Sequence, residues 1–453
     1  MTGRAGGPDR QDGAHLLLIV GLSGLAAGQA LAAALRVTST VSVAFVTGWV
    51  DPQPVREQWE RHSQGGEFRT VDSLDGVVSA AVELHRRRPL DGVVTYSERL
   101  LRPHAEIAHR LGLRGNSPAS VAVAQSKLRQ RQALAARGVP SPRFALLREE
   151  ADVSAAVATV GLPAVFKPSF GAGSQGVALA RTAGEVCELL RRGKTTDTAL
   201  TRLQNEDAFV LEERMSVEGA PGSPYADYVS VESLLLDGEI EHVAVTDRVR
   251  LSHGYIEEGM VLPTRLGKEA ADAVVECADQ AIRAIGLTEG AAHTEVALTA
   301  TGPKIVEVNA RAGGPIPGML MAAADYDYAA AIARAALNLR SAGRGAFTAA
   351  SWFRYIPIPY GEWLVAAQAS PEEVRARFPE LVQLSLRFGV GRRISRHGTQ
   401  HLGTFTVRGT DLDHARATAA AVERAIGFKL EPVDVPPPAD EPTGRADASR
   451  TGR

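Results

Sequence analysis

Cysteine and an excess of charge of one sign are both nearly absent from this chain of 453 residues. The two cysteines, Cys187 and Cys277, do not lie in a metal-ligand spacing, which favours a reduced cytoplasmic protein. With 50 basic and 52 acidic residues the formal charge is −2, which gives no electrostatic reason to expect binding to nucleic acid or to an anionic membrane. The length and the 45% hydrophobic content predict a globular protein of two or three domains.

A long unbroken hydrophobic run is also lacking. The stretch over residues 16–35, LLLIVGLSGLAAGQALAAAL, approaches the length of a membrane span, but three glycines and Gln29 interrupt it. No clear basic segment or cleavage site marks it as a secretion signal. A buried strand over 16–20 that turns into a helix fits better. The turn Gly21-x-Ser23-Gly24 is a weak candidate for a phosphate cradle, and a tight turn for helix packing is favoured.

Strands and helices alternate over the first quarter of the chain, which predicts a parallel sheet with helices on both faces. Residues 117–138 are then expected to form one long helix that ends at Gly138. Later residues are typical of short strands and hairpins, among them a hairpin at Asp237-Gly238. Near the C-terminus, residues 401–428 read as a strand followed by a helix.

The glycines of Gly171-x-Gly173-x-x-Gly176 have the spacing of a dinucleotide-binding fingerprint. That fingerprint requires a helix directly after the glycines, whereas a strand-like VALAR follows and the next helix begins only after Arg181. An NAD-dependent dehydrogenase is therefore the least favoured interpretation, and the glycines are expected to connect two strands. Such a loop either folds over phosphates, with Lys167 beside it, or is a plain surface hairpin, and taken alone the two are equally favoured.

A second pattern, HTEVALTATGPKIVEVNARAGG over residues 293–314, predicts a β-hairpin that turns at Thr301-Gly302-Pro303. Side chains two apart share a face, so Glu307, Asn309 and Arg311 point the same way, and an antiparallel register places Glu295 opposite Glu307. Like charges facing each other are a poor structural pair but suit a hard cation such as Mg²⁺; the alternative is a solvated face on which the two glutamates do not meet. The opposite face, with Val296, Leu298, Val306 and Val308, is expected to belong to the core.

Lys127 on a helix, Lys167 before the glycine loop, VLEERM over 210–215 and the 293–314 hairpin occur in this order. Together they resemble the ATP-grasp carboxylate–amine ligases, above all the bacterial L-amino-acid ligases that make dipeptides. The resemblance spans about residues 15–432, and its most specific part is Glu307-x-Asn309-x-Arg311-x-Gly313-Gly314.

This resemblance implies an α/β protein with an ATP-grasp fold. A Rossmann-like parallel-sheet domain is expected over 15–117 and an ATP-grasp domain over 118–340, with a mobile lid subdomain at about 143–213. An α+β subdomain is expected over 341–433. The end segments 1–14 and 434–453 are polar and are expected to be disordered.

The resemblance also implies roles for individual residues. Lys127 and Lys167 are expected to hold the phosphates of ATP, and Glu212 and Glu213 to lie in a hinge beside the adenine. Arg311 is expected to steady an acyl phosphate, and it is the predicted catalytic residue together with Lys167 and Glu307. The residues expected to close over the phosphates are Gly171, Gly173, Ser174, Gln175 and Gly176. Those expected to bind Mg²⁺, with Mn²⁺ able to substitute, are Glu295, Glu307 and Asn309. Those expected to contact the amino-acid substrate are Glu257, Arg311 and Gly313.

Several positions depart from the family pattern. Ser126 precedes Lys127 where the family often has Asp or Asn, and Met260 stands where some dipeptide ligases carry a histidine. Tyr228 stands where many relatives carry a glutamate associated with the ribose, which leaves Asp227 or Glu232 as candidates. Arg248 and Arg250 face either an anionic substrate or solvent.

The function implied is an ATP-dependent ligation of a small-molecule carboxylate to an amine through an acyl phosphate, with a homodimer as a possible assembly. One alternative is an ATP-grasp enzyme with another acceptor, such as bicarbonate or formate. The other is a nucleotide-binding protein without ligase activity, which the complete set of Glu295, Glu307, Asn309 and Arg311 disfavours.

Overall fold

The computed structural model describes residues 11, 13–48, 50–171, 176–195, 208–217, 219–220, 222–251, 257–395 and 401–433. The predicted loop residues Gly173, Ser174 and Gln175 and the C-terminal segment 434–453 lie outside these ranges, as does most of segment 1–14. Across the ranges given, no helix combines the length and apolar character that a membrane crossing requires.

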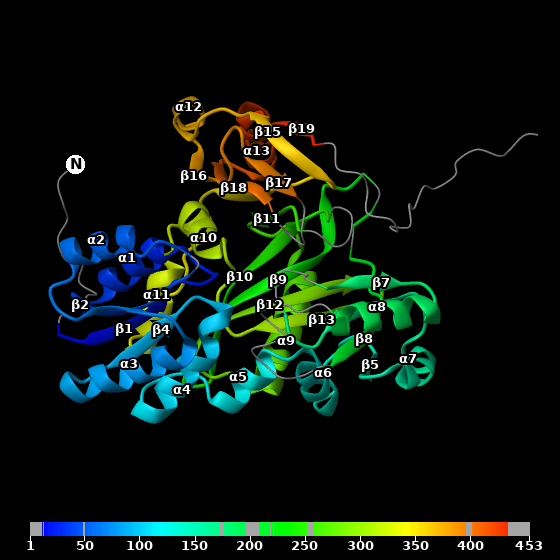
Figure 1. Cartoon of the computed structure of the whole chain (residues 1–453), viewed down its shortest axis with the longest axis horizontal. Helices are drawn as coiled ribbons and strands as arrows, with labels where there is room; N and C mark the ends of the chain where they lie inside the picture. The colour runs from blue at the N-terminus through cyan, green and yellow to red at the C-terminus, as the bar shows by residue number, and fades with distance from the viewer. Residues whose placement is uncertain are drawn as a thin grey trace, which may run out of the picture.

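The N-terminal part is a four-stranded parallel sheet in the order β3-β2-β1-β4, as the alternating pattern predicts. Side chains of β1 alternate between two cores: Leu16 and Leu18 pack on the side of α1, while Leu17 and Ile19 pack on the side of α3 and α4 (Figure 1). The elements are β1 (His15–Val20), α1 (Ala27–Val37), β2 (Thr40–Val46), α2 (Gln53–His62), β3 (Phe68–Val71), α3 (Leu74–Arg87), β4 (Gly92–Thr95), the 3₁₀ helix η1 (Glu98–Leu100) and α4 (Leu101–Leu111).

The glycine turn after β1 packs against neighbouring strands. Gly21 and Gly24 have φ of 112° and 120°, which favour glycine. A Cβ atom at either position would lie 2.2 Å from a backbone oxygen, that of Val46 or of Tyr96. The close approach explains both glycines and fits the tight-turn interpretation.

The single helix expected over 117–138 is wrong, because two helices occupy this segment: α5 (Pro118–Ala124) and α6 (Lys127–Ala136). Ser126 between them is extended, and its side chain accepts a hydrogen bond from the backbone N–H of Arg129, so it begins α6 as an N-cap. Lys127 therefore lies at the first position of α6. Its backbone N–H donates to Ser169 O at 2.8 Å, which ties the helix to the strand that leads into the glycine loop.

That strand belongs to a second four-stranded sheet, with the order β5-β8-β6-β7. β6 and β7 are an antiparallel pair, so the glycines do connect two neighbouring strands. Helices α7 and α8 pack on this sheet around Phe166 and Leu211. The elements are β5 (Phe144–Leu147), η2 (Glu150–Asp152), α7 (Val153–Val160), β6 (Ala164–Pro168), β7 (Ala178–Ala180), α8 (Ala183–Thr195) and β8 (Phe209–Glu213).

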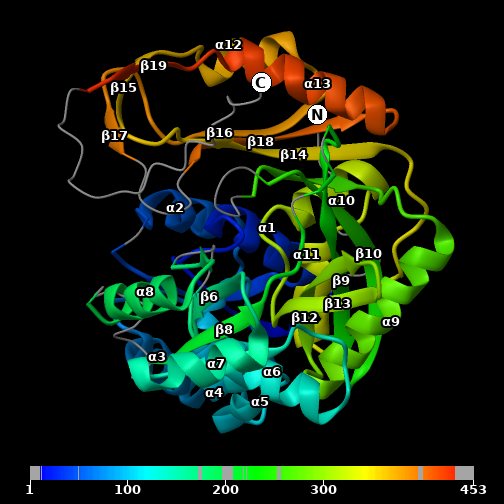
Figure 2. The same ribbon diagram turned by 90° about the vertical axis from the view of Figure 1, so that its right-hand side faces the viewer.

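An eight-stranded sheet, β13-β12-β9-β10-β11-β14-β18-β16, forms the centre of the molecule. Helix α9 packs on one face, and α10 and α11 cover the other, where α11 also packs against α1 (Figures 1 and 2). The predicted hairpin at Asp237-Gly238 connects β9 to β10, and both residues have positive φ. The elements are β9 (Tyr225–Leu236), β10 (Glu239–Val249), β11 (Gly259–Leu262), α9 (Lys268–Ile285), β12 (Gly290–Thr299), β13 (Gly302–Asn309), α10 (Ile316–Ala324) and α11 (Tyr328–Ala336).

Strands from the C-terminal region extend this same sheet. β14, β18 and β16 continue it, and a separate three-stranded sheet, β17-β15-β19, lies beside them. Helix α13 packs on β14 and β18, so the predicted strand followed by a helix is confirmed (Figure 2). The elements are β14 (Ala350–Pro357), β15 (Glu362–Ala367), α12 (Pro371–Arg377), β16 (Leu381–Leu386), β17 (Arg393–Ser395), β18 (His401–Gly409), α13 (Leu412–Ile426) and β19 (Lys429–Pro432).

Candidate active site

One large cleft of about 1670 Å³ is lined by the N-terminal sheet, the sheet of β5–β8 and the eight-stranded sheet. This volume exceeds the roughly 300–1,000 Å³ of an ordinary small-molecule pocket, so the cleft has room for more than one substrate. Gly176 is not among the described residues that line it. The predicted site residues that do line it are Lys127, Lys167, Gly171, Glu212, Glu213, Glu257, Glu295, Glu307, Asn309, Arg311 and Gly313.

The predicted register of the β12–β13 hairpin is confirmed, since Glu295 pairs with Glu307. A β-bulge follows at once: Val296 pairs with Ile305, so Val306 is an extra residue on β13. The expectation that Val306 belongs to the core is wrong, because this bulge brings its side chain into the lining of the cleft. Val296 and Val308 are fully buried, as expected.

Both carboxylates of the hairpin form ion pairs with basic side chains of the chain. Lys127 Nζ lies 3.0 Å from Glu307 Oε1 and donates to Gly171 O at 2.8 Å. Glu295 Oε1 lies 3.6 Å from His293 Nε2 and 3.5 Å from Arg248 Nη2. Burial opposes ionisation of Glu295, but the contact with His293 and the charge on Arg248 hold the pKa of its carboxyl well below the ordinary range.

The donor chemistry of this face fits a hard divalent cation. Glu295, Glu307 and Asn309 offer two carboxylates and an amide oxygen, which Mg²⁺ prefers. Among the residues that the structure describes, no group of three or more His, Cys, Asp or Glu is arranged to hold a metal by itself. An ion at this face would therefore take further ligands from a bound substrate, which is how Mg²⁺ commonly binds beside nucleotide phosphates.

The cleft end beside β6 and β8, called here the lid end, contains a buried ion cluster. Glu212 is 1% exposed. Its carboxylate accepts from Arg131 Nε at 2.9 Å and from Lys167 Nζ at 2.7 Å. Burial opposes ionisation, but these two cations lower the pKa of Glu212 to about 2. The sequence analysis missed Arg131, although it lies four residues after Lys127 and therefore on the same helix face.

Glu213 has different partners, Arg143 at 3.3 Å and Lys304 at 3.7 Å. Both glutamates of VLEERM therefore engage cations of the chain, and only Glu212 does so in full burial.

Arg248 faces the cleft, whereas Arg250 donates to Ala220 O. The side chain of Arg248 is 1% exposed and reaches Glu257 Oε1 at 2.5 Å and His293 Nε2 at 2.9 Å. Tyr228 donates to the same oxygen of Glu257 at 3.0 Å, so two neighbours fix this carboxylate at the edge of the cleft. Of the two alternatives for Arg248, the solvated strand edge is therefore wrong, and the side chain lies at the cleft.

The ribose candidate Glu232 is fully buried, and its carboxylate contacts His293 Nδ1 at 2.7 Å. It does not line the cleft. At the neighbouring turn, a Cβ atom on Gly313 would lie 2.7 Å from His293 Nδ1, which explains why glycine is found there.

Arg311 joins the hairpin to the N-terminal region. Its Nε lies 3.1 Å from Glu98 Oε2, and its guanidinium donates to Asn309 Oδ1 at 3.3 Å. Gln125 donates to the backbone oxygen of Glu98 at 2.7 Å and so helps to hold it. Sequence reasoning missed Glu98, because no motif surrounds it and only the tertiary fold brings it to Arg311.

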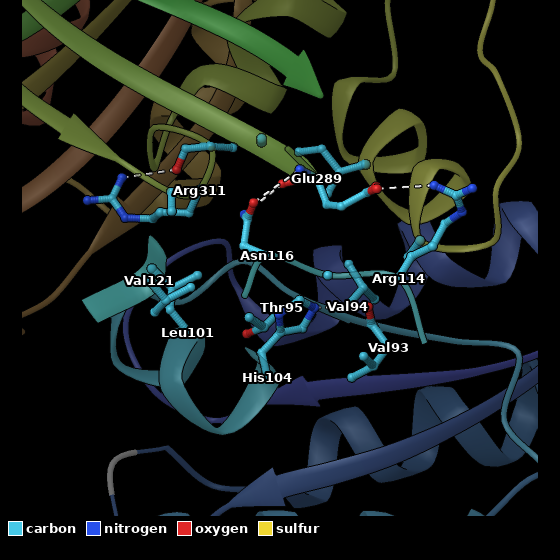
Figure 3. A pocket seen from close by; sticks show the side chains of 17 residues that line it. Val93, Val94, Thr95, Leu101, His104, Arg114, Asn116, Val121, Glu289 and Arg311 are labelled. Carbon is cyan, nitrogen blue, oxygen red and sulfur yellow. Dashed lines mark hydrogen bonds and ion pairs between the residues drawn. The ribbon is translucent and has the colours of Figure 1, made fainter. Parts of the chain in front are cut away.

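A second cavity, of about 40 Å³, lies between β4, α4 and the segment that contains Arg311 (Figure 3). Asn116 donates to Glu289 O at 2.8 Å, and Arg114 lies 3.1 Å from the Glu289 carboxylate. The cavity has space for only a few water molecules and cannot hold a substrate. Its polar contacts instead fasten the N-terminal region to the central sheet beneath Arg311.

Comparison with known proteins identifies the class of the domain that lines much of this cleft. Residues 160–317 match the family model of the ATP-grasp domain, so the chain contains an ATP-grasp domain. The structure is similar to that of L-amino acid ligase from Bacillus licheniformis, with a TM-score of 0.77 and 19% identity over 93% of this chain and 99% of that one. This likeness confirms the predicted α/β ATP-grasp fold.

Two named relatives share sequence with the chain. Alanine–anticapsin ligase of Bacillus subtilis is 29% identical over 52% of each chain. Human carnosine synthase 1 is 34% identical over 51% of this chain and 29% of its own length. The match thus spans about half the length of the bacterial relative and under a third of the human one.

Proposed function

We propose that this protein is an ATP-dependent ligase that joins a small carboxylic acid, such as an amino acid, to an amine and releases ADP and phosphate. The observation that carries the proposal is the pairing of Glu295 with Glu307 across the hairpin, beside Lys127 and in the same cleft as Lys167 and Arg311. The names of the relatives, a ligase and a synthase, support the same class of reaction.

The first step needs positive charge around a transferring phosphoryl group. A carboxylate oxygen of the acid attacks the terminal phosphorus of ATP, the bond to ADP breaks, and an acyl phosphate forms. Lys127 and Lys167 are the side chains that would hold the phosphates, and Glu295, Glu307 and Asn309 those that would hold Mg²⁺. The ion would neutralise phosphate charge, and positioning and charge stabilisation dominate this kind of transfer.

The second step forms the amide. The amine nitrogen attacks the acyl carbon, phosphate leaves with the electron pair of the C–O bond, and the nitrogen loses a proton. Arg311, fixed by Glu98 and Asn309, would stabilise negative charge on the acyl phosphate with a planar guanidinium. Gly171 and the rest of its loop would exclude water, which otherwise hydrolyses the acyl phosphate.

A screen of amino-acid pairs for ADP release, followed by mass spectrometry of the products, tests the proposal. Lys167→Ala and Glu307→Ala are expected to lower ADP formation about a hundredfold or more. Lys268→Ala is a matched control, because Lys268 is a lysine on α9 with an 87% exposed side chain. Near-normal turnover in both site variants would refute the mechanism.

Trapping with hydroxylamine adds a second readout. A hydroxamate of the amino acid is expected if an acyl phosphate forms. ATP hydrolysis without any hydroxamate or amide, in the presence of every amino acid tested, would instead indicate another acceptor or no ligase activity.

A further inference from the structure

The cleft continues beyond the hairpin to a wall contributed by the C-terminal strands, called here the C-terminal end and made of Tyr355, Arg387 and His401. The ring of Tyr355 stacks on His401 with centroids 4.2 Å apart and meets Phe353 edge-on at 4.7 Å. Arg387 follows β16, and its backbone N–H donates to Leu402 O at 2.8 Å. The aromatic contacts and this backbone hydrogen bond therefore fix the part of the chain from which the Arg387 side chain extends.

This wall belongs to the same region as the residues proposed to react. Burial raises the pKa of Tyr355, and the charges that act on its hydroxyl come from Glu257, Arg248, Arg311 and Arg387. The phenol of Tyr355 therefore stays neutral at ordinary pH. Arg311, Glu257 and Arg387 all line this one cleft, so a substrate held at Arg311 and Glu257 shares the cleft with the Arg387 guanidinium.

Arg387 differs from most of the lysines and arginines that line the cleft. Lys127 and Lys167 have the partners Glu307 and Glu212. Three arginines of the cleft are paired in the same way: Arg110 with Glu106, Arg248 with Glu257, and Arg311 with Glu98. No carboxylate of the residues that the structure describes pairs with Arg387. The same is true of Arg102 on α4, which also lines the cleft.

We propose that Arg387 determines acceptor specificity by binding a carboxylate on the amine substrate, so that the site selects amino acids over uncharged amines. This inference rests on the proposed function. An α-amino acid carries its carboxylate on the carbon that bears the amine, so its amine can face the acyl group while its carboxylate meets the guanidinium. A planar guanidinium forms two parallel hydrogen bonds to such a group, and this geometry gives specificity as well as energy.

The test compares each acceptor with its own primary amide: L-alanine with L-alaninamide, and L-phenylalanine with L-phenylalaninamide. The quantity measured is the ratio of kcat/KM for the two acceptors at saturating ATP and acid substrate, from ADP release and product mass. Arg387→Ala is expected to lower this ratio about ten- to a hundredfold, the range for a hydrogen bond to a charged group. Arg387→Lys is expected to keep part of the preference, because it retains the charge but loses the planar fork.

Arg102→Ala is the matched control, since it removes another cleft cation with no carboxylate partner among the described residues and is expected to keep the wild-type ratio. An unchanged ratio in Arg387→Ala, or an equal loss in both variants, would overturn the proposal. So would a loss seen only when the acid substrate carries a second carboxylate, which would assign Arg387 to the other substrate. A wild-type protein that forms no amide with any amino-acid pair would refute the proposed function itself, a distinct result.

Discussion

At the lid end of the cleft, Lys167 and Arg131 both contact the buried carboxylate of Glu212, whereas at the C-terminal end the guanidinium of Arg387 has no carboxylate partner in the described part of the chain. The lid-end charges are buried, and a buried ion is costly unless its partner is present. Arg387 is exposed, so its charge needs no partner from the chain and is free for a substrate. The comparison suggests that the lid end is organised before ligands arrive, while the C-terminal end selects among them.

The hairpin lies between these two ends and shares features of both. Lys127 pairs with Glu307, and Arg311 pairs with Glu98, but all four side chains line the cleft and remain accessible to a ligand. Their ion pairs hold each side chain in place, and phosphates or a cation can then compete for the same groups. Three variants, one for each region, test this difference in how far the charged side chains are paired before a ligand binds.

The largest effect is expected at the lid end. Glu212→Gln keeps the shape of the side chain but leaves Arg131 and Lys167 with an uncompensated buried charge. Breaking one side of a buried ion pair costs about 3–5 kcal/mol of the free energy of unfolding. The carboxylate contributes fully above its ordinary pKa of 4.5, and this stabilisation is lost as the pH falls toward 2. Urea unfolding at pH 7 measures the loss, and isothermal titration with ADP measures the expected loss of nucleotide binding.

Glu213→Gln is the control, because the side chain of Glu213 is 28% exposed and its nearer partner, Arg143, is 62% exposed, while Lys304 is more distant at 3.7 Å. An exposed ion pair contributes only about 0–1 kcal/mol. Equal destabilisation by the two substitutions would mean that the lid end is no more preorganised than the surface.

The second effect concerns the region between the ends. Arg311→Lys keeps a positive charge but cannot reach Glu98 and Asn309 together with the geometry of a planar guanidinium. We expect kcat to fall about a hundred- to a thousandfold, the usual cost of removing one group that stabilises developing charge. The KM for ATP should change little. Steady-state kinetics with Arg250→Lys as the control, an arginine outside the cleft, would show whether the loss is specific; wild-type rates in Arg311→Lys would remove Arg311 from the site.

Sequence reasoning reached the hairpin because its signals are local. Alternating side chains and a Thr-Gly-Pro turn set the register of Glu295 and Glu307, and the motif that follows places Asn309 and Arg311 on the same face. The β-bulge that brings Val306 into the cleft gives no such signal, because alternation along the sequence assumes an unbroken register between the two strands.

The partners of the site residues could not be predicted in the same way. Glu98 reaches Arg311 only because the N-terminal sheet docks on the central one, and Arg387 reaches the cleft only because β18 and β16 extend the central sheet. The break between α5 and α6 has a local signal, because serine is a favoured N-cap residue, but the prediction of one helix over 117–138 did not use it.

The smallest effect is expected beside the C-terminal end. Tyr228→Phe removes the hydroxyl that donates to Glu257 Oε1 and leaves Arg248 as the partner of that oxygen. A hydrogen bond to a charged group is worth about 1.5–3 kcal/mol, but Arg248 remains, so we expect the KM for the amino-acid substrate to rise only about three- to tenfold with kcat nearly unchanged. Tyr225→Phe is the control, because Tyr225 lies on the same strand but packs beneath Arg265 and beside Trp352, away from Glu257. A fall in kcat as large as that of Arg311→Lys would show that Glu257 acts in the chemical step, and the distinction between a preorganised and a selecting end of the cleft would then fail.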